Sequence, residues 1–325
     1  MAVYTQVPAE EIDAFLTRYD AGRLVSAKGI AEGVENSNYL LETTGADGSG
    51  HRYILTLYEK RVDEADLPFF MDLLDHLGAR GCLVPRFIAD RSGQRLQQLA
   101  GRPACLIEFL TGISVTEPTP AQSRAAGQAL GELHRAADGF ASERPNALDK
   151  AGWHDLARKC GADFDQIAPG LAARVVDELA FLDAHWPADL PRSVIHADLF
   201  PDNVLMLGDR VTGLIDFYFS CTDVRAYDLA ITHSAWTFSH DGATFFGDRA
   251  AALGAGYAQA HGLTDAERAA FPILCRGAAL RFLLTRAYDW INTPADALVT
   301  RKDPLAYLRR LDFYANADAA DLLGA

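Results

Sequence analysis

The chain has 325 residues, and its 30 basic and 44 acidic side chains give a formal net charge of −14. A chain of this length exceeds one ordinary hydrophobic core, so we expect two lobes. The acidic balance argues against a nucleic-acid partner, which requires a basic face that attracts the phosphate backbone.

The cysteines and the lack of long apolar runs indicate the compartment. The five cysteines are scattered, without a C-x-x-C pair or matching histidines, which disfavours disulfides and structural zinc and predicts buried thiols. Residues 1–8 lack a basic region followed by an apolar run, and no apolar stretch is long enough to span a bilayer. We therefore expect a cytoplasmic protein without a membrane partner.

The first 110 residues predict an amphipathic helix followed by a small antiparallel sheet with one packed helix. Ile12, Phe15, Leu16 and Tyr19 recur at helical spacing, which predicts an amphipathic helix over residues 8–19. Strand patterns bounded by turn residues follow, with one further helix. The strands are expected at 24–29, 38–43, 52–58, 95–99 and 104–109, and the helix at 64–79.

Residues 29–38 join the first two of these strands and are candidates for nucleotide binding. Glycines allow close backbone approach, and exposed N–H groups with the Ser37 hydroxyl would suit phosphate oxygens. Gly33, Asn36 and Ser37 are the candidate contacts. Taken alone, the segment is more typical of an ordinary hairpin. The chain contains no G-x-x-x-x-G-K-[ST] loop.

After Gly112 the sequence becomes rich in alanine and leucine with helical periodicity. We place the lobe boundary at 110–112 and expect a ligand cleft between a β-rich nucleotide-binding lobe, residues 1–110, and a helical catalytic and substrate-binding lobe, residues 111–325. His134 lies on an apolar helical pattern and is more typical of a core histidine than of a catalytic one. Helices are expected at 120–136, 170–186, 226–238, 248–261 and 264–291.

The segment His196–Asn203, followed thirteen positions later by Asp216, carries the strongest functional signal. Kinase-type phosphoryl transfer needs one carboxylate to accept a hydroxyl proton, and an amide oxygen and a second carboxylate to hold Mg²⁺ on the nucleotide phosphates. Asp198, Asn203 and Asp216 supply this set in order. Two short apolar strands around Gly208 separate Asn203 from Asp216. Antiparallel pairing would bring these two residues within roughly 5 Å at the backbone, where both can bind one hard cation.

Two neighbours are expected to support this loop. The His196 imidazole would hydrogen-bond backbone or a carboxylate and fix the loop, rather than transfer a proton. Asp228, which follows Tyr227, either anchors the same region or is an ordinary carboxylate at a helix start.

Together these residues resemble the aminoglycoside phosphotransferase-like kinases, small-molecule kinases with a bilobal, protein-kinase-like α+β fold. The family pattern H-G-D-x-x-x-x-N occurs as His196–Asn203, with Ala197 in place of glycine, and the I-D-F motif occurs as Ile215-Asp216-Phe217. Within this group the chain looks most like the homoserine kinases. The stretches that resemble them are 33–39, 53–59, 196–203 and 281–290.

The resemblance implies ATP-dependent phosphorylation of the L-homoserine hydroxyl to O-phospho-L-homoserine, with Mg²⁺, on the way to threonine. Asp198 would orient the hydroxyl and take its proton, while Asn203 and Asp216 hold the metal. The end of the last strand in the first lobe, at Glu108 and Leu110, would offer backbone groups to adenine.

Homoserine also carries a carboxylate and an ammonium, so its pocket should contain a cationic fork and an acceptor. Arg281 and Tyr288 share a helical face with Thr285, which makes Arg281 a candidate carboxylate clamp. An arginine that snorkels from a packed helix is the alternative. Asp202 is a candidate partner for the ammonium.

One departure from the kinase pattern concerns phosphate binding. Kinases usually place a lysine on the third strand, where this chain has Thr56. Either Lys60 or Arg61 compensates, or the glycine-bearing segment carries more of the phosphate binding. Two other functions stay open: a kinase of choline, an amino sugar or an aminoglycoside, and a non-catalytic nucleotide-binding protein.

Overall fold

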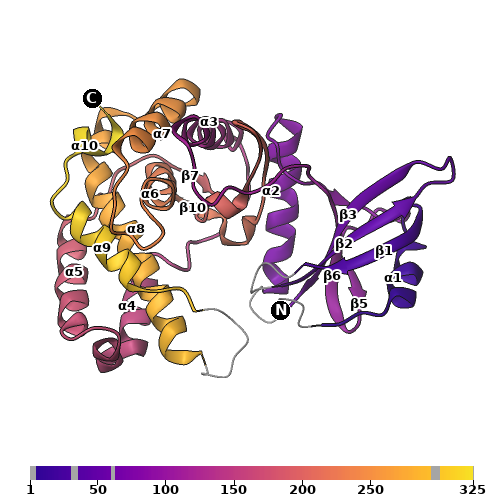
Figure 1. Cartoon of the computed structure of the whole chain (residues 1–325), viewed down its shortest axis with the longest axis horizontal. Helices are drawn as coiled ribbons and strands as arrows, with labels where there is room; N and C mark the ends of the chain where they lie inside the picture. Colours follow the sequence, from indigo (N-terminus) through magenta and orange to yellow (C-terminus); the bar gives the residue numbers. More distant parts are fainter. Residues whose placement is uncertain (1–4, 31–35, 60–62, 294–300, 325) are drawn as a thin grey trace. The chain divides into compact units, whose positions relative to one another are not determined.

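The computed structural model describes residues 5–30, 36–59, 63–293 and 301–324 (Figure 1). The chain forms two compact units, Met1–Thr111 and Gly112–Ala325. The first contains an antiparallel sheet and the second is mainly helical, which confirms the predicted mixed α+β class.

Within the described residues, the N-terminal unit is built on an antiparallel sheet with the strand order β1-β2-β3-β6-β4, and β5 pairs with β6 outside this path. Two α-helices and a 3-10 turn accompany the sheet. The elements are α1 (Ala9–Leu16), β1 (Arg23–Gly29), β2 (Asn36–Thr44), β3 (Gly50–Tyr58), η1 (Glu64–Asp66), α2 (Leu67–Ala79), β4 (Phe87–Ile88), β5 (Gln97–Leu99) and β6 (Arg102–Glu108).

One face of this sheet packs against α1. Leu41, Leu55 and Leu57 point to the same face because side chains alternate along a strand, and all three are fully buried. Ile12 and Leu16 of α1 belong to the same cluster. The helix ends at Leu16, earlier than predicted, because the chain closes a tight turn after it.

The C-terminal unit contains eight α-helices among the described residues and two small antiparallel sheets, β8-β9 and β10-β7. The helices are α3 (Pro120–Ala136), α4 (Lys150–Cys160), α5 (Leu171–His185), α6 (Arg225–Trp236), α7 (Gly247–Ala260), α8 (Asp265–Asn292), α9 (Leu305–Tyr314) and α10 (Ala319–Leu323). The strands and 3-10 turns are η2 (Gly161–Gln166), β7 (Arg192–Ile195), η3 (Pro201–Asn203), β8 (Val204–Leu207), β9 (Arg210–Leu214), η4 (Phe217–Phe219) and β10 (Cys221–Val224).

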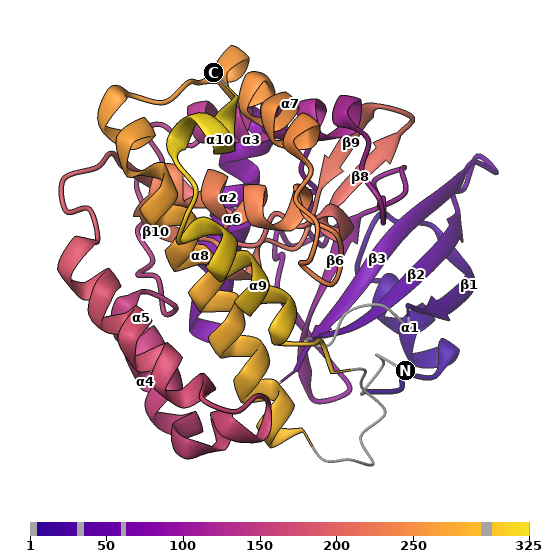
Figure 2. The same cartoon turned by 60° about the vertical axis from the view of Figure 1, so that its left-hand side comes forward.

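Helix α6 lies at the centre of this unit, in contact with α3, α7, α8, β7 and β10 (Figure 1). Every residue of α6 except Arg225 and Ala235 is buried. A helix that is buried all round can present polar side chains to the interior only where they find partners. Helix α9 lies alongside the long helix α8 (Figure 2).

The structure also describes the cysteines and the length of the helices. Four of the five cysteines are buried. No helix in the described ranges is long and apolar enough to cross a bilayer.

Candidate active site

The predicted hairpin between the two motif halves is confirmed. Strands β8 and β9 pair antiparallel, with Val204 opposite Leu214. The backbone N–H of Ile215 donates to the carbonyl oxygen of Asn203 at 3.0 Å. Asp216 follows at once with a left-handed backbone, φ 64°, and immediately precedes η4. The hairpin therefore brings Asn203 and Asp216 to the same end of one two-stranded sheet.

Residues 196–200, which connect β7 to η3, carry the candidate base Asp198 and are called the catalytic loop below. Buried side chains fix the backbone of this loop. Asp228 of α6 accepts the N–H of His196 at 2.7 Å and the N–H of Ala197 at 2.8 Å on its two carboxylate oxygens. Trp236, also on α6, donates from Nε1 to the carbonyl of Leu199 at 2.9 Å. The central helix thus positions the loop through backbone contacts, and Asp228 anchors the loop in addition to standing in the first turn of α6.

Ala197 occupies the family's glycine position with φ 63°, in the left-handed region. A residue other than glycine pays about 1–2 kcal/mol there. Both polar groups of this residue are held, the N–H by Asp228 and the carbonyl by Arg281, whose Nη1 donates at 2.5 Å. These contacts stabilise the strained conformation that directs the next residue, Asp198.

Two buried histidines complete the support of the loop. His134 donates from Nε2 to Asp228 at 3.0 Å and accepts from the Tyr257 hydroxyl at 2.9 Å. His196 donates from Nε2 to the carbonyl of Ile215 at 3.0 Å, which ties the loop to the end of the hairpin. Burial lowers the pKa of both histidines, so both are neutral near pH 7. Burial alone would raise the pKa of Asp228, but the hydrogen bonds from His134 and the loop hold it below its ordinary value.

Asp198 is half-buried at the centre of a group of charges. Burial raises its pKa well above the usual range of an aspartate. The Arg281 guanidinium opposes this shift, while the carboxylates of Asp216 and Asp202 add to it. A carboxylate with a raised pKa accepts a proton more readily, which suits a general base.

Asn203 and Asp216 offer oxygen ligands of the kind that Mg²⁺ prefers. The Asn203 side chain donates from Nδ2 to the carbonyl of Asp198 at 2.8 Å and to its carboxylate at 3.3 Å. Since the backbone carbonyl oxygen only accepts, the amide nitrogen must face Asp198. Oδ1 is then left without a hydrogen-bond partner in the described part of the chain. Together with the exposed Asp216 carboxylate, this oxygen fits a divalent cation.

The candidate nucleotide residues of the N-terminal unit differ in their surroundings. Gly33 lies outside the described residues. Ser37 is fully buried, and its hydroxyl accepts from the N–H of Thr5 at 3.0 Å and donates to Glu59 at 2.8 Å. Asn36 accepts from the N–H of Glu59 at 3.3 Å. The side chains of Asn36 and Ser37 are therefore hydrogen-bonded within the unit. If this segment binds phosphate, its backbone N–H groups would be the donors.

The end of β6 provides the other candidate nucleotide contacts. The Glu108 side chain is ion-paired with Arg86 at 3.0 Å, and the Glu108 N–H donates to the Arg86 carbonyl. The backbone N–H and carbonyl of Leu110 have no hydrogen-bond partner among the residues that the structure describes. Leu110 therefore has both groups available for a ligand.

Thr56 lies on β3, between its strand partners Asn38 and Cys105. It is buried, and its hydroxyl donates to Asn38 Oδ1 at 2.8 Å. Protein kinases pair the lysine of this strand with a glutamate of the following helix. Here the carboxylates of Asp72 and Asp75 on α2 instead bind Arg95. Both halves of the ion pair are thus missing from β3 and α2.

Lys60 and Arg61, the suggested replacements for the strand lysine, lie outside the described residues. The structure therefore describes no side chain at these two positions.

The candidate substrate residues do not form one cluster. Arg281 is only 1% exposed, and its guanidinium lies against the rings of Phe282 and Phe219 while it binds the catalytic loop. Tyr288 lies beside Lys159 of α4, 6.0 Å from ring centroid to Nζ. Asp202 is exposed in η3 and close enough to Asp198 to raise its pKa.

The sequence interpretation missed several residues around the loop: Trp236, Tyr257, Arg286 and Lys302. Each comes from a segment far along the chain, so no local spacing connects it with the motif. The stretch 281–290, singled out by resemblance, was the one signal that included Arg286.

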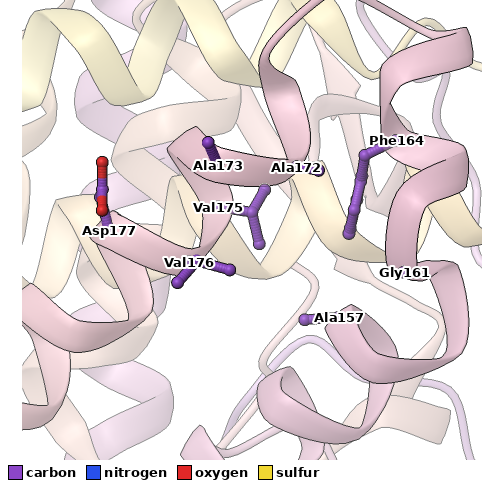
Figure 3. A pocket seen from close by; sticks show the side chains of 8 residues that line it. All are labelled: Ala157, Gly161, Phe164, Ala172, Ala173, Val175, Val176 and Asp177. Carbon is purple, nitrogen blue, oxygen red and sulfur yellow. The ribbon is translucent and has the colours of Figure 1, made fainter.

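An open apolar pocket of about 380 Å³ lies between α4, η2 and α5 (Figure 3). Phe164, Val175 and Val176 are among the side chains that line it. None of the candidate site residues does so, and we do not assign this pocket to the reaction.

Comparisons with known proteins agree with the family predicted from the motifs. The chain is 56% identical to a homoserine kinase of Zymomonas mobilis, with 99% of each chain covered. It is 55% identical to a homoserine kinase of Methylobacterium radiotolerans, covering 99% of this chain and 98% of that protein.

Solved structures share the fold. An amicoumacin kinase in complex with AMP-PNP and Ca²⁺ superposes with a TM-score of 0.71 at 17% identity, over 95% of this chain and 94% of that one. A spectinomycin phosphotransferase in complex with ADP and spectinomycin gives 0.68 at 14% identity, over 98% of each. The model of the phosphotransferase enzyme family matches residues 26–263. The chain belongs to this family.

Proposed function

We propose that the protein transfers the γ-phosphoryl group of ATP to the hydroxyl of L-homoserine, giving O-phospho-L-homoserine for threonine synthesis. The observation that carries the choice of acceptor is identity above 50% to homoserine kinases over nearly the whole chain. Because the likeness includes the C-terminal unit, it covers the part of the chain that carries Asp198.

Asp198 is proposed as the group that receives the acceptor hydroxyl. The hydroxyl would donate its hydrogen bond to the carboxylate, which takes the proton as the oxygen attacks phosphorus. The backbone contacts from α6 support this role, because they hold Asp198 in one orientation before any ligand binds. Such prior positioning lowers the entropy cost of reaching the reactive geometry.

Mg²⁺ is proposed to bind Asn203 Oδ1 and the Asp216 carboxylate. When bound, the ion would neutralise charge on the nucleotide phosphates. The hydrogen bonds from Asn203 to Asp198 hold the amide so that its oxygen stays available. The hairpin fixes the spacing of both ligands.

Residues 1–110, the predicted nucleotide-binding lobe, are proposed to bind ATP, and residues 111–325 to hold the metal, the base and the acceptor. The unpaired backbone groups of Leu110 support adenine binding after β6. Because a lysine is missing at Thr56, we propose that phosphate is bound by Mg²⁺ together with either Lys60 or Arg61 or the backbone N–H groups near Gly33.

The test is ADP release that depends on homoserine, measured beside choline, an amino sugar and an aminoglycoside. Brisk turnover of homoserine alone supports the proposal. If homoserine is not phosphorylated and another alcohol is, that alcohol takes the place of homoserine as the proposed acceptor. Asp198→Asn should lower turnover by about 10³-fold while MgATP binding, followed by calorimetry, stays within about threefold. If parent and variant both bind ATP but transfer phosphate to no acceptor, the protein is a non-catalytic nucleotide-binding protein.

A further inference from the structure

Two cationic side chains lie beside the catalytic loop without an assigned role: Arg286 of α8 and Lys302, which precedes α9. Phe200 belongs to the loop and comes two residues after Asp198. Its ring meets Phe282 of α8 edge to face at 4.9 Å. The Lys302 ammonium lies 5.9 Å from the same Phe200 ring. Lys302 therefore approaches the loop just past the proposed base.

Arg286 reaches the same place from α8. Phe282 stacks on Tyr307 of α9 at 5.1 Å, so Phe200, Phe282 and Tyr307 form one continuous aromatic floor. The Arg286 guanidinium lies over the Tyr307 ring at 4.5 Å. Both cations thus rest on the aromatic floor that begins at the catalytic loop.

Neither cation forms an ion pair within the described residues, although the Asp198 carboxylate interacts electrostatically with both and the Asp303 carboxylate with Arg286. Arg286 donates one hydrogen bond, to the carbonyl of Asp303 at 3.2 Å, and makes no ion pair there. The Asp303 carboxylate instead accepts the N–H of Leu305. By contrast, Arg276, on the same helix as Arg286, is doubly hydrogen-bonded to the buried carboxylate of Glu178.

Burial makes this unpaired charge costly. It lowers the pKa of the Arg286 guanidinium, which means that the charge is disfavoured where it stands. An anion that arrived beside it would offset that cost, and a guanidinium can bind a carboxylate through two parallel hydrogen bonds.

We propose that Arg286 and Lys302 bind the carboxylate of the acceptor and so select an amino acid over an amino alcohol. The inference rests on the proposed function. The hydroxyl and carboxylate of homoserine are only a few covalent bonds apart, so a clamp must stand close to Asp198. Arg286 and Lys302 both lie near enough to interact electrostatically with the Asp198 carboxylate. Arg281, which is enclosed and bound to Ala197, is then a positioning residue for the loop.

The experiment compares three acceptors at saturating MgATP. These are L-homoserine, 3-aminopropan-1-ol, which lacks the carboxylate, and 4-hydroxybutanoate, which lacks the ammonium. Arg286→Gln should lower kcat/KM for both carboxylates by roughly 10- to 100-fold, mainly through KM, and leave the amino alcohol unchanged. Lys302→Gln, at an exposed position, should lower kcat/KM for the same two carboxylates by roughly two- to fivefold. Arg301→Gln is the matched control, because Arg301 lies over Trp290 and donates to its carbonyl.

The deciding quantity is the ratio of kcat/KM for homoserine to that for 3-aminopropan-1-ol. A lower ratio in both variants, with Arg301→Gln unchanged, supports the clamp. An unchanged ratio in both overturns it. If Arg286→Gln does not fold, Lys302→Gln decides by the same criterion. If the parent does not turn over the amino alcohol, its inhibition constant against homoserine replaces kcat/KM. A parent that never phosphorylates homoserine defeats the proposed function instead, which is a separate outcome.

Discussion

Arg281 was selected by its helical periodicity, but its role depends on a contact with a residue far away in the sequence. Helical spacing correctly places it on α8 with Thr285 and Tyr288, but spacing cannot reveal that its partner is the carbonyl of Ala197, 84 positions earlier. Asn203 and Asp216 were easier to relate, because a short hairpin brings them together. Local geometry is readable from sequence, while the packing that surrounds the loop is not.

Replacing Arg281 by Gln tests its positioning role. Loss of the hydrogen bond to Ala197 should let Asp198 turn away from the reacting hydroxyl. We therefore expect kcat to fall by about 10- to 100-fold, while the KM for ATP and the KM for homoserine each change by less than about threefold. Arg281→Lys should restore part of kcat, since an ammonium can reach the same carbonyl. A large rise in the homoserine KM with kcat preserved would instead identify Arg281 as a substrate clamp.

Among the elements, those with strong apolar periodicity, clear caps or a neighbouring hairpin partner were predicted well, and those without such a local signal were not. Helix α3 begins at Pro120 behind a capping box of Thr119 and Gln122 and ends at Ala136, as predicted. Helix α4 was missed because only Trp153 and Cys160 of its residues are buried, which leaves little periodic signal. Strands β7 and β10 pair across a long stretch of chain, so neither has a local hairpin partner to indicate it.

Helices α3 and α7 pack at a distance that only glycine allows. A Cβ atom at Gly256 of α7 would lie 2.0 Å from the backbone oxygen of Arg124 on α3. Gly256→Ala should therefore lower the unfolding free energy by about 2 kcal/mol, measured by urea denaturation. Gly247→Ala, in the same helix, is the control: its Cβ would meet Phe245 at 3.9 Å, an ordinary contact. Equal stability of the two variants would contradict the close packing.

His233 connects α6 to the last helices of the chain. It accepts from the Tyr314 hydroxyl at 2.7 Å and donates to the Leu322 carbonyl at 2.9 Å. Burial lowers its pKa from 6.5 to about 4. The unfolded chain therefore takes up the proton first as pH falls, so this group's contribution to stability is complete above about pH 6.5 and is lost toward about pH 4.

Between about pH 7 and about pH 5, His233 should account for a loss of about 2 kcal/mol in unfolding free energy. His233→Asn should be less stable at neutral pH and should show a pH dependence smaller by that amount, measured by urea titrations at both pH values. The same pH slope in parent and variant would show that His233 does not govern it.

The whole chain combines a division between Thr111 and Gly112 with a strong negative charge. Alternating strands before this point and helical periodicity after it made the α+β class readable from sequence. The way the other C-terminal helices pack around α6 could not be predicted, because it depends on contacts between segments that are far apart in the sequence. The family, in turn, was readable from a few motif residues together with stretches in both halves of the chain.

The net charge of −14 should affect the binding of anionic ATP. Raising the ionic strength from about 10 mM to about 150 mM shortens the Debye length from about 30 Å to about 8 Å, which screens long-range repulsion. The KM for ATP should therefore fall by about twofold, while that for zwitterionic homoserine should change less. Steady-state kinetics in an inert salt measure both. A rise in the KM for ATP would mean that local cations dominate.

Thr56 has a consequence for chemical probing. Reagents that acylate the β3 lysine of protein kinases depend on a nucleophilic amine at that strand position. In this protein the position carries a buried hydroxyl that is already bonded to Asn38. A profiling experiment based on such reagents would leave this position unlabelled, so an ATP-competitive covalent inhibitor of this enzyme would need a different nucleophile.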